Sequence, residues 1–469
     1  MTSFGFGPQD SDDENSSENN SNNNSNNNSN NNSNNNSNNS GNENGNEQGG
    51  FDFAAMMEQV QRQLSEQFQK MGVNPVGFVN PLAHMNGGEA LPQSALRDHA
   101  RKAISNFGSR PIGNVDVDTT SKAFELADLW LNEATLFPVT SAGKATFACS
   151  RQDWVDASMA GWHKTFEPVA AGLIDALSRM LEEATAQDGV ETPIPVQALA
   201  GALRGFIGNM LATQLGQSIG GLAGSITGAH DVGLPLIDPV RPILIPENIS
   251  AWGADLEVRS SEVFLFHALR EGAIARLFDH NPWLVSYIRS AIIEYGRGIR
   301  IDLDAIQQQA QEAIENAMNS GEFDPSKPHE FTINLNNGIF SPEETPQQRE
   351  ALTKLETVLA LIDGWAEEVI RAAAGERLPS MPQLIETLRR KRASSNPAQQ
   401  LFATLLGLEV SPRLAREAST FFTTIREAHG VDVRDRIWSG ILPTAEELHS
   451  PLEFIKTTEI PDDLSGLEG

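Results

Sequence analysis

The chain has 469 residues, a hydrophobic content of 39% and a formal net charge of −28. This acidic excess argues against nucleic acid and against an anionic membrane surface as partners, because binding to phosphates needs a surplus of Lys and Arg. A single cysteine, Cys149, excludes a disulfide within the chain, and residues 1–50 carry no Lys or Arg that would begin a secretion or import signal. We therefore expect a cytoplasmic protein.

The first 50 residues hold a low-complexity run of Ser and Asn with acidic residues on either side of it. This run has nothing to bury, so residues 1–50 are predicted to be disordered, either as a spacer or as a solubilising or partner-binding tail. Apolar residues then recur three and four apart from Phe51 to Met71, which predicts an amphipathic helix. A linker rich in Gly and Pro completes residues 51–92.

The compact body is predicted to span residues 93–458, with a short acidic tail at 459–469. One helix is expected over Ser121–Phe137, where apolar side chains share a face. Ser150 is a suitable N-cap for a long helix that begins at the next residue, and Pro168 is expected to kink that helix.

The segment Ala198–Thr227 is apolar and dense in glycine. Small residues at a spacing of four are typical of helices that approach one another closely, in membranes and elsewhere. Arg204 and Gln217 interrupt the segment, and such groups are costly in a bilayer, so a buried central helix is expected instead of a membrane span. The spaced glycines are Gly216, Gly220, Gly224 and Gly228.

The rest of the body is dominated by helical patterns, with two short strand candidates at Arg241–Pro246 and Glu330–Leu335. The sequence therefore predicts a mainly α fold with a small β element. The later helices are expected at Ser260–Phe278, Asn281–Gly298, Asp302–Met318, Pro346–Ala374, Met381–Arg392, Pro397–Leu406, Pro412–His429 and Ala445–Lys456.

Short segments in order along residues 90–458 resemble those of a known family. They include Arg151-Gln-Asp-Trp154, Asp231-Val-Gly-Leu-Pro235, Ile245-Pro-Glu-Asn248, Leu269-Arg-Glu271, Pro282-Trp-Leu284, Ile362-Asp-Gly-Trp365 and Leu442-Pro-Thr-Ala-Glu446. Together they resemble the zincin-like family of bacterial zinc-dependent metalloproteases, also labelled hydrolases, one branch of which is linked by name to deazaflavin coenzyme biosynthesis. The resemblance implies a zincin-like helical body and zinc as a cofactor.

Family members with an intact site carry His-Glu-x-x-His on one helix, a spacing that puts two imidazoles on one face to grip zinc. Phe278 and Pro282-Trp-Leu284 keep the family's frame after that motif and so fix the register here. By this resemblance Arg270 and Ile274 stand where the two histidines belong, and Glu271 stands at the catalytic glutamate. A branch that the chain resembles more closely also has Arg at the first position.

The resemblance places Asp363 at the family's third metal ligand, and Trp365 where the other branch has a histidine. His267 and Glu271 lie four residues apart on one helical face, so a metal site rebuilt from His267 and Asp363 with neighbouring carboxylates is an open alternative. The second alternative is that no metal binds and that Glu271 is an ion-paired carboxylate, which fills the old metal cavity beside Arg270.

Two functions follow from this pattern. The first is a zinc-dependent metalloprotease or hydrolase, weakly active or inactive, in which Glu271 would deprotonate a zinc-bound water. The second is a non-catalytic scaffold, a pseudoenzyme, that keeps the cleft for a peptide or protein partner. The basic run at 389–392 is expected to complement the dipole of its helix and not to bind an anion.

Overall fold

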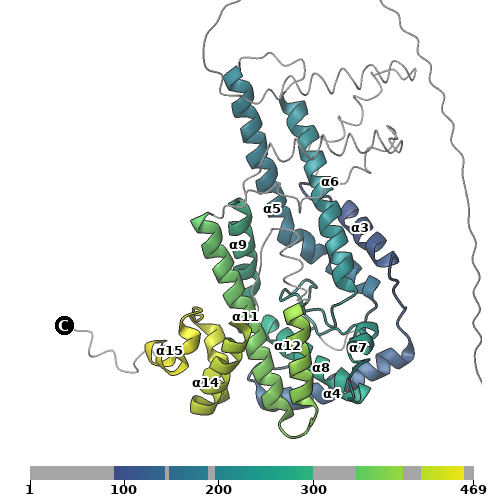
Figure 1. The fold of residues 1–469 in the computed structure, drawn as a ribbon, viewed down its shortest axis with the longest axis vertical. Coiled ribbons are helices and arrows are strands. Elements are labelled where there is room, and N and C mark those ends of the chain that lie inside the picture. Colours follow the sequence, from purple (N-terminus) through teal and green to yellow (C-terminus); the bar gives the residue numbers. More distant parts are fainter. Residues whose placement is uncertain (1–88, 143–146, 189–195, 299–344, 395–413, 459–469) are drawn as a thin grey trace, which may run out of the picture. The chain divides into compact units, whose positions relative to one another are not determined.

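The computed structural model describes residues 89–142, 147–188, 196–298, 345–394 and 414–458, and these are almost entirely helical (Figure 1). The predicted fold class, mainly α with a small β element, is confirmed. Several predictions lie outside the described residues: the tail at 1–50, the helix in 51–92, Asp302–Met318, Glu330–Leu335, Pro397–Leu406 and the tail at 459–469.

The helices of the described residues, in chain order, are α3 (Gln93–Ser105), α4 (Asn114–Ala134), α5 (Arg151–Asp188), α6 (Val196–Ala223), α7 (Pro246–Trp252), α8 (Ser260–His280), α9 (Trp283–Arg297), α11 (Pro346–Ala374), α12 (Met381–Ser394), α14 (Leu414–Arg436) and α15 (Pro451–Thr458). Most lie within a few residues of the predicted ranges. The predicted helix Ala445–Lys456 is wrong in part, because a 3₁₀ turn at Glu447–His449 precedes α15.

Ser150 caps α5 as predicted. Its hydroxyl accepts a hydrogen bond from the Asp153 backbone N–H at 3.1 Å, and the Asp153 carboxylate accepts one from the Ser150 backbone N–H at 3.1 Å. This reciprocal arrangement satisfies two donors at the start of the helix. Pro168 lies inside α5, which continues to Asp188.

The glycine spacing on α6 serves close packing against α3. A Cβ atom at Gly216 would lie 2.7 Å from the Leu96 carbonyl oxygen, and one at Gly220 would lie 2.6 Å from that of Ala100. The close approach predicted for this segment is therefore confirmed, and α3 is the partner helix (Figure 1). Within the described residues no helix is long and apolar enough to span a membrane.

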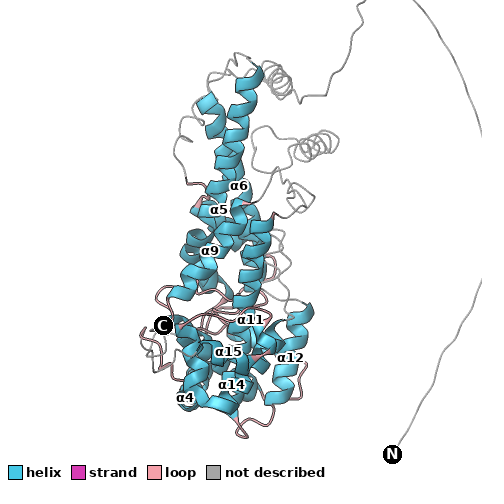
Figure 2. Cartoon of the chain, turned by 90° about the vertical axis from the view of Figure 1, so that its left-hand side faces the viewer, coloured by secondary structure: helices cyan, strands magenta, loops and turns pink. Residues whose placement is uncertain are grey.

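The predicted strand Arg241–Pro246 is wrong in extent. Leu244 alone forms bridges, one to Ala148 and one to Gly228, and Figure 2 shows helices and loops in the described part of the chain. The Leu244 N–H donates to Phe147 at 2.7 Å, while the next residue already enters the turn that starts α7 at Pro246. The extended backbone is too short to form a ladder.

Helix α8 lies at the centre of the packing. Every residue from Val263 to Phe278 is buried, and the helix contacts α4, α7, α11 and α12. An amphipathic surface helix would leave one face polar and open. Since α8 carries His267, Arg270 and Glu271 within this buried stretch, each polar group there needs a partner from the surrounding elements.

Candidate functional site

Arg270 of α8 forms a salt bridge with Asp363 of α11. Asp363 also binds Arg392 of α12, which lies 3.7 Å from Asp231 in the loop after α6. These four residues alternate in charge and join four parts of the fold. We call them the charge cluster. The two side chains that the sequence resemblance places at the first histidine and at the third ligand are thus paired directly with each other.

Burial lowers the pKa of Arg270, and burial together with Arg270 lowers the pKa of Arg392 to about 9. Arg392 is therefore protonated at neutral pH, and an arginine beside carboxylates keeps its charge. Burial opposes ionisation of Asp231, but Arg392 and Arg270 outweigh it and hold the pKa of Asp231 below its usual value. Asp231 is therefore a carboxylate at neutral pH, paired with a charged Arg392.

Glu271, the residue after Arg270 on α8, points into the loop that follows α6. Its Oε1 accepts hydrogen bonds from the backbone N–H groups of Ala229 at 3.1 Å and Ile243 at 3.0 Å, and lies 2.8 Å from Nδ1 of His230. Its Oε2 accepts one from the His230 backbone at 3.2 Å. A Cβ at Gly228 would lie 2.4 Å from Oε2, so only glycine allows this approach. The carboxylate anchors the loop.

His267 is 2% exposed, and its Nδ1 lies 3.0 Å from Oγ1 of Thr227. That hydroxyl donates to Asp231 at 2.7 Å, so its oxygen accepts the Nδ1 proton and fixes the tautomer of His267. The other ring nitrogen, Nε2, is buried without a hydrogen-bond partner, and the ring stands edge-on to Trp252 at 4.7 Å. Burial, helped by the neighbouring arginines against the pull of Asp231, lowers the pKa of His267 to about 4.

Ile274 and Trp365, predicted to line the site, both lie in the hydrophobic core. Trp365 is fully buried and donates from Nε1 to Asp435 at 2.9 Å. Its ring meets that of Trp438 edge-on at 6.2 Å. These contacts tie α11 to α14 behind the charge cluster.

Sequence reasoning missed the partners that surround the predicted residues. Thr227 and Asp231 lie on either side of Gly228, the last of the spaced glycines, and the sequence analysis assigned them no role. Arg392 lies in the last turn of α12, as the dipole argument expected, but it also pairs with Asp363. Arg389 likewise binds the buried Glu367 of α11. The basic run at 389–392 faces two carboxylates, Asp363 and Glu367, which are four residues apart on α11. These matching charges in two predicted helices were the signal by which the sequence could have indicated the pairing.

The donors present do not fit a zinc ion. Zinc needs three or four N, S or O donors converging on one point. In the described ranges, no group of three or more His, Cys, Asp and Glu side chains is placed to hold a metal ion. Asp363 is bound by two arginines, Glu271 accepts four hydrogen bonds, and His267 offers one nitrogen.

A pocket of about 430 Å³ opens beside the charge cluster. Its lining residues come from α8, α11, α12 and α14: Arg270, Asp363, Glu367, Leu388, Arg389, Arg392, Ala393, Ala415, Arg416 and Glu417. We call it the arginine pocket. A smaller pocket of about 250 Å³ shares Leu388 and Arg392 with it and is also lined by Thr227 and Trp252.

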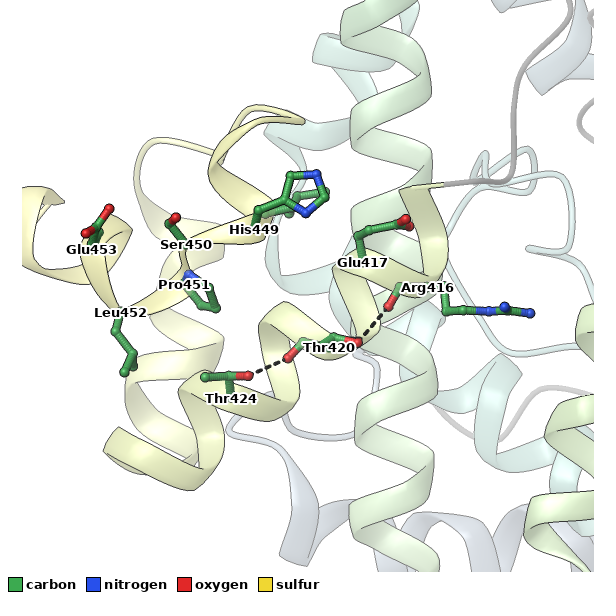
Figure 3. Close-up of a pocket in the computed structure, with 10 residues that line it drawn as sticks. Arg416, Glu417, Thr420, Thr424, His449, Ser450, Pro451, Leu452 and Glu453 are labelled. Carbon is green, nitrogen blue, oxygen red and sulfur yellow. Dashed lines mark hydrogen bonds between the residues drawn. The ribbon is translucent and has the colours of Figure 1, made fainter.

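A third pocket, of about 610 Å³, lies between α14 and the segment around α15. Figure 3 shows Glu417 and His449 among the residues that line it, with the Arg416 side chain pointing away from His449. Arg416 and Glu417 also line the arginine pocket, so the first turn of α14 separates the two.

Comparison with known proteins gives one family and one fold. A family model described as a zincin-like metallopeptidase matches residues 93–455. The fold is similar to the crystal structure of a "putative hydrolase with a novel fold" from Chloroflexus aurantiacus, with a TM-score of 0.53 and 18% identity over 79% of this chain and 100% of the other. A search of curated proteins found no match. Because the family model spans most of the chain, from α3 into α15, this chain belongs to the zincin-like metallopeptidase family.

Proposed function

We propose that this chain is a non-catalytic member of the zincin-like family, which uses the body at residues 93–458 to bind a peptide or protein partner in the arginine pocket. The observation that carries the proposal is the salt bridge between Arg270 and Asp363. These residues stand at positions that the family resemblance assigns to metal ligands. The single cysteine, which forms no disulfide within the chain, supports the proposed cytoplasmic location.

A zinc ion would compensate the carboxylate at position 363 and bring a reactive water with it. Arg270 supplies a positive charge to the same carboxylate, but a guanidinium neither coordinates nor acidifies water. Removing Asp363 would leave the buried Arg270 without its carboxylate, whereas Asp363 would still pair with Arg392 if Arg270 were removed. Glu271, with its four hydrogen bonds, has little capacity left to act as a general base.

A weak zinc-dependent hydrolase is the competing proposal, with His267 and Asp363 as ligands and Glu271 as the base. The unpartnered, buried Nε2 of His267 favours it, because a neutral imidazole nitrogen is a common metal ligand. Its weakness is the number of donors, since one nitrogen and a carboxylate held by two arginines fall short of a zinc site.

Metal analysis of the full chain, expressed with added zinc, separates the two proposals. We expect far less than one zinc per chain, an unfolding midpoint unchanged by a chelator, and no cleavage of a mixed peptide library followed by mass spectrometry. Stoichiometric zinc that disappears in Asp363→Asn or Glu271→Gln would overturn the non-catalytic role. Peptide cleavage abolished by Glu271→Gln would do the same.

A further inference from the structure

The charged residues of the arginine pocket are unevenly matched. Four arginines and three carboxylates line it. Two of the carboxylates are held by more than one donor: Asp363 by Arg270 and Arg392, and Glu367 by arginines on α11 and α12 as well as by the Ser419 hydroxyl at 2.9 Å. Neither is left to repel an incoming anion strongly.

Two arginines of the pocket keep unused donors. Arg270 is 3% exposed and bonds Asp363 through Nη2, while its Nε–H is buried without a partner. Such a buried, unpaired N–H costs free energy that a ligand acceptor would recover. Arg416 is exposed at the pocket, and within the described residues no carboxylate forms an ion pair with it. A planar guanidinium is suited to bidentate binding of a carboxylate.

The pocket also holds an unused acceptor. Oε2 of Glu417 is buried and has no hydrogen-bond donor within reach. Glu417 follows Arg416 in the first turn of α14, and both residues line the pocket. Leu388, Ala393 and Ala415 supply the apolar part of the lining. A ligand that satisfies all of these groups needs an anionic end, an adjacent N–H donor and a small apolar part.

Resting on the proposed binding function, we propose that the arginine pocket recognises the free C-terminal residue of a peptide. The terminal carboxylate would accept from Arg270 and Arg416, and the N–H of the last residue would donate to Glu417. Leu388 and the two alanines would contact a small side chain. A volume of about 430 Å³ lies within the usual range of small-ligand sites. Inorganic phosphate lacks the N–H donor.

The test uses the full chain and a pool of N-terminally labelled pentapeptides that end in Ala, made as free acids and as C-terminal carboxamides. We expect the carboxamides to bind at least about tenfold more weakly in fluorescence anisotropy, because they lose a charge-assisted hydrogen bond. Arg416→Gln should weaken free-acid binding and leave carboxamide binding unchanged. Its control is Arg436→Gln, an exposed arginine of the same helix outside the pocket.

Equal binding of the two peptide forms would overturn recognition of the carboxylate and leave the proposed binding function standing. If neither peptide form binds, this inference is also overturned. The metal analysis then decides separately whether the chain is non-catalytic. Competition by inorganic phosphate as strong as that by acetylalanine would indicate a general anion site and reject the peptide terminus. A loss of free-acid binding in Arg436→Gln equal to that in Arg416→Gln would reject the pocket.

Discussion

The contact between α6 and α3 and the surroundings of α8 are held together by different interactions. Where α6 meets α3, the backbones touch because Gly216 and Gly220 have no side chains. Around α8, two adjacent residues of opposite charge, Arg270 and Glu271, are buried and bind separate partners. The first region depends on shape and the second on charge and hydrogen bonding. Loss of one group should therefore cost more at α8 than the gain of one methyl costs at α6.

The largest effect is expected at Glu271. Glu271→Ala leaves the N–H groups of Ala229, His230 and Ile243 without their acceptor, and we expect the free energy of unfolding to fall by about 4 kcal/mol. Denaturant unfolding measures this. Glu271→Gln is the matched control, because it keeps an acceptor oxygen and should cost clearly less. Equal losses in both variants would show that the charge, not the hydrogen bonds, anchors the loop.

The next effect concerns the charge cluster. Arg270→Met removes one of two cations from Asp363 and should lower the free energy of unfolding by about 3 kcal/mol. Adding Asp363→Leu should restore part of that loss, since the pair is then replaced by apolar groups. A double-mutant cycle with about 1–3 kcal/mol of coupling is expected. Additive losses would mean that the two side chains do not stabilise each other.

Acid should weaken the α8 region through His267. Its pKa is lowered to about 4 in the folded chain, whereas the unfolded chain binds a proton near the ordinary value of about 6.5. Between those values the unfolded state holds more protons, so stability is complete above pH ~6.5 and falls as the pH drops towards ~4, by about 3 kcal/mol.

His267→Gln, which does not titrate, is the variant that isolates this effect. Chemical unfolding at several pH values should give a shallower pH dependence than the unsubstituted chain over that window. An unchanged pH dependence would assign the acid sensitivity to other groups, among them Asp231, whose pKa is also lowered.

The smallest effect is expected at the α6 glycines. Gly220→Ala places a methyl 2.5 Å from Cβ of Ala103 and should lower the free energy of unfolding by about 1–2 kcal/mol. Gly221 is the control, because a Cβ there meets nothing within 4 Å, and Gly221→Ala should stabilise the helix by up to about 1 kcal/mol. Thermal unfolding compares the two. A tolerated Gly220→Ala would show that α3 can move away from α6.

Much of the fold could be read from local patterns. The range Pro346–Ala374 matches α11, and the Ser150 cap marks the start of α5 as predicted. The strand at Arg241–Pro246 was wrong in extent, because a short apolar run does not reveal how soon the next helix begins. The predicted roles of Glu271 in catalysis and of His267 and Asp363 in metal binding stay predictions.

The sequence by itself determined most of the described helices and the close packing of α6, and its resemblance to the family placed Arg270 and Ile274 at the histidine positions. These depend on residues near one another in the chain or on an ordered series of short motifs. Only the tertiary structure decided what the α8 side chains do. It paired Arg270 with Asp363, 93 residues away, and directed Glu271 to the backbone of the loop after α6. Buried charges require partners, but local sequence does not say which distant element supplies them.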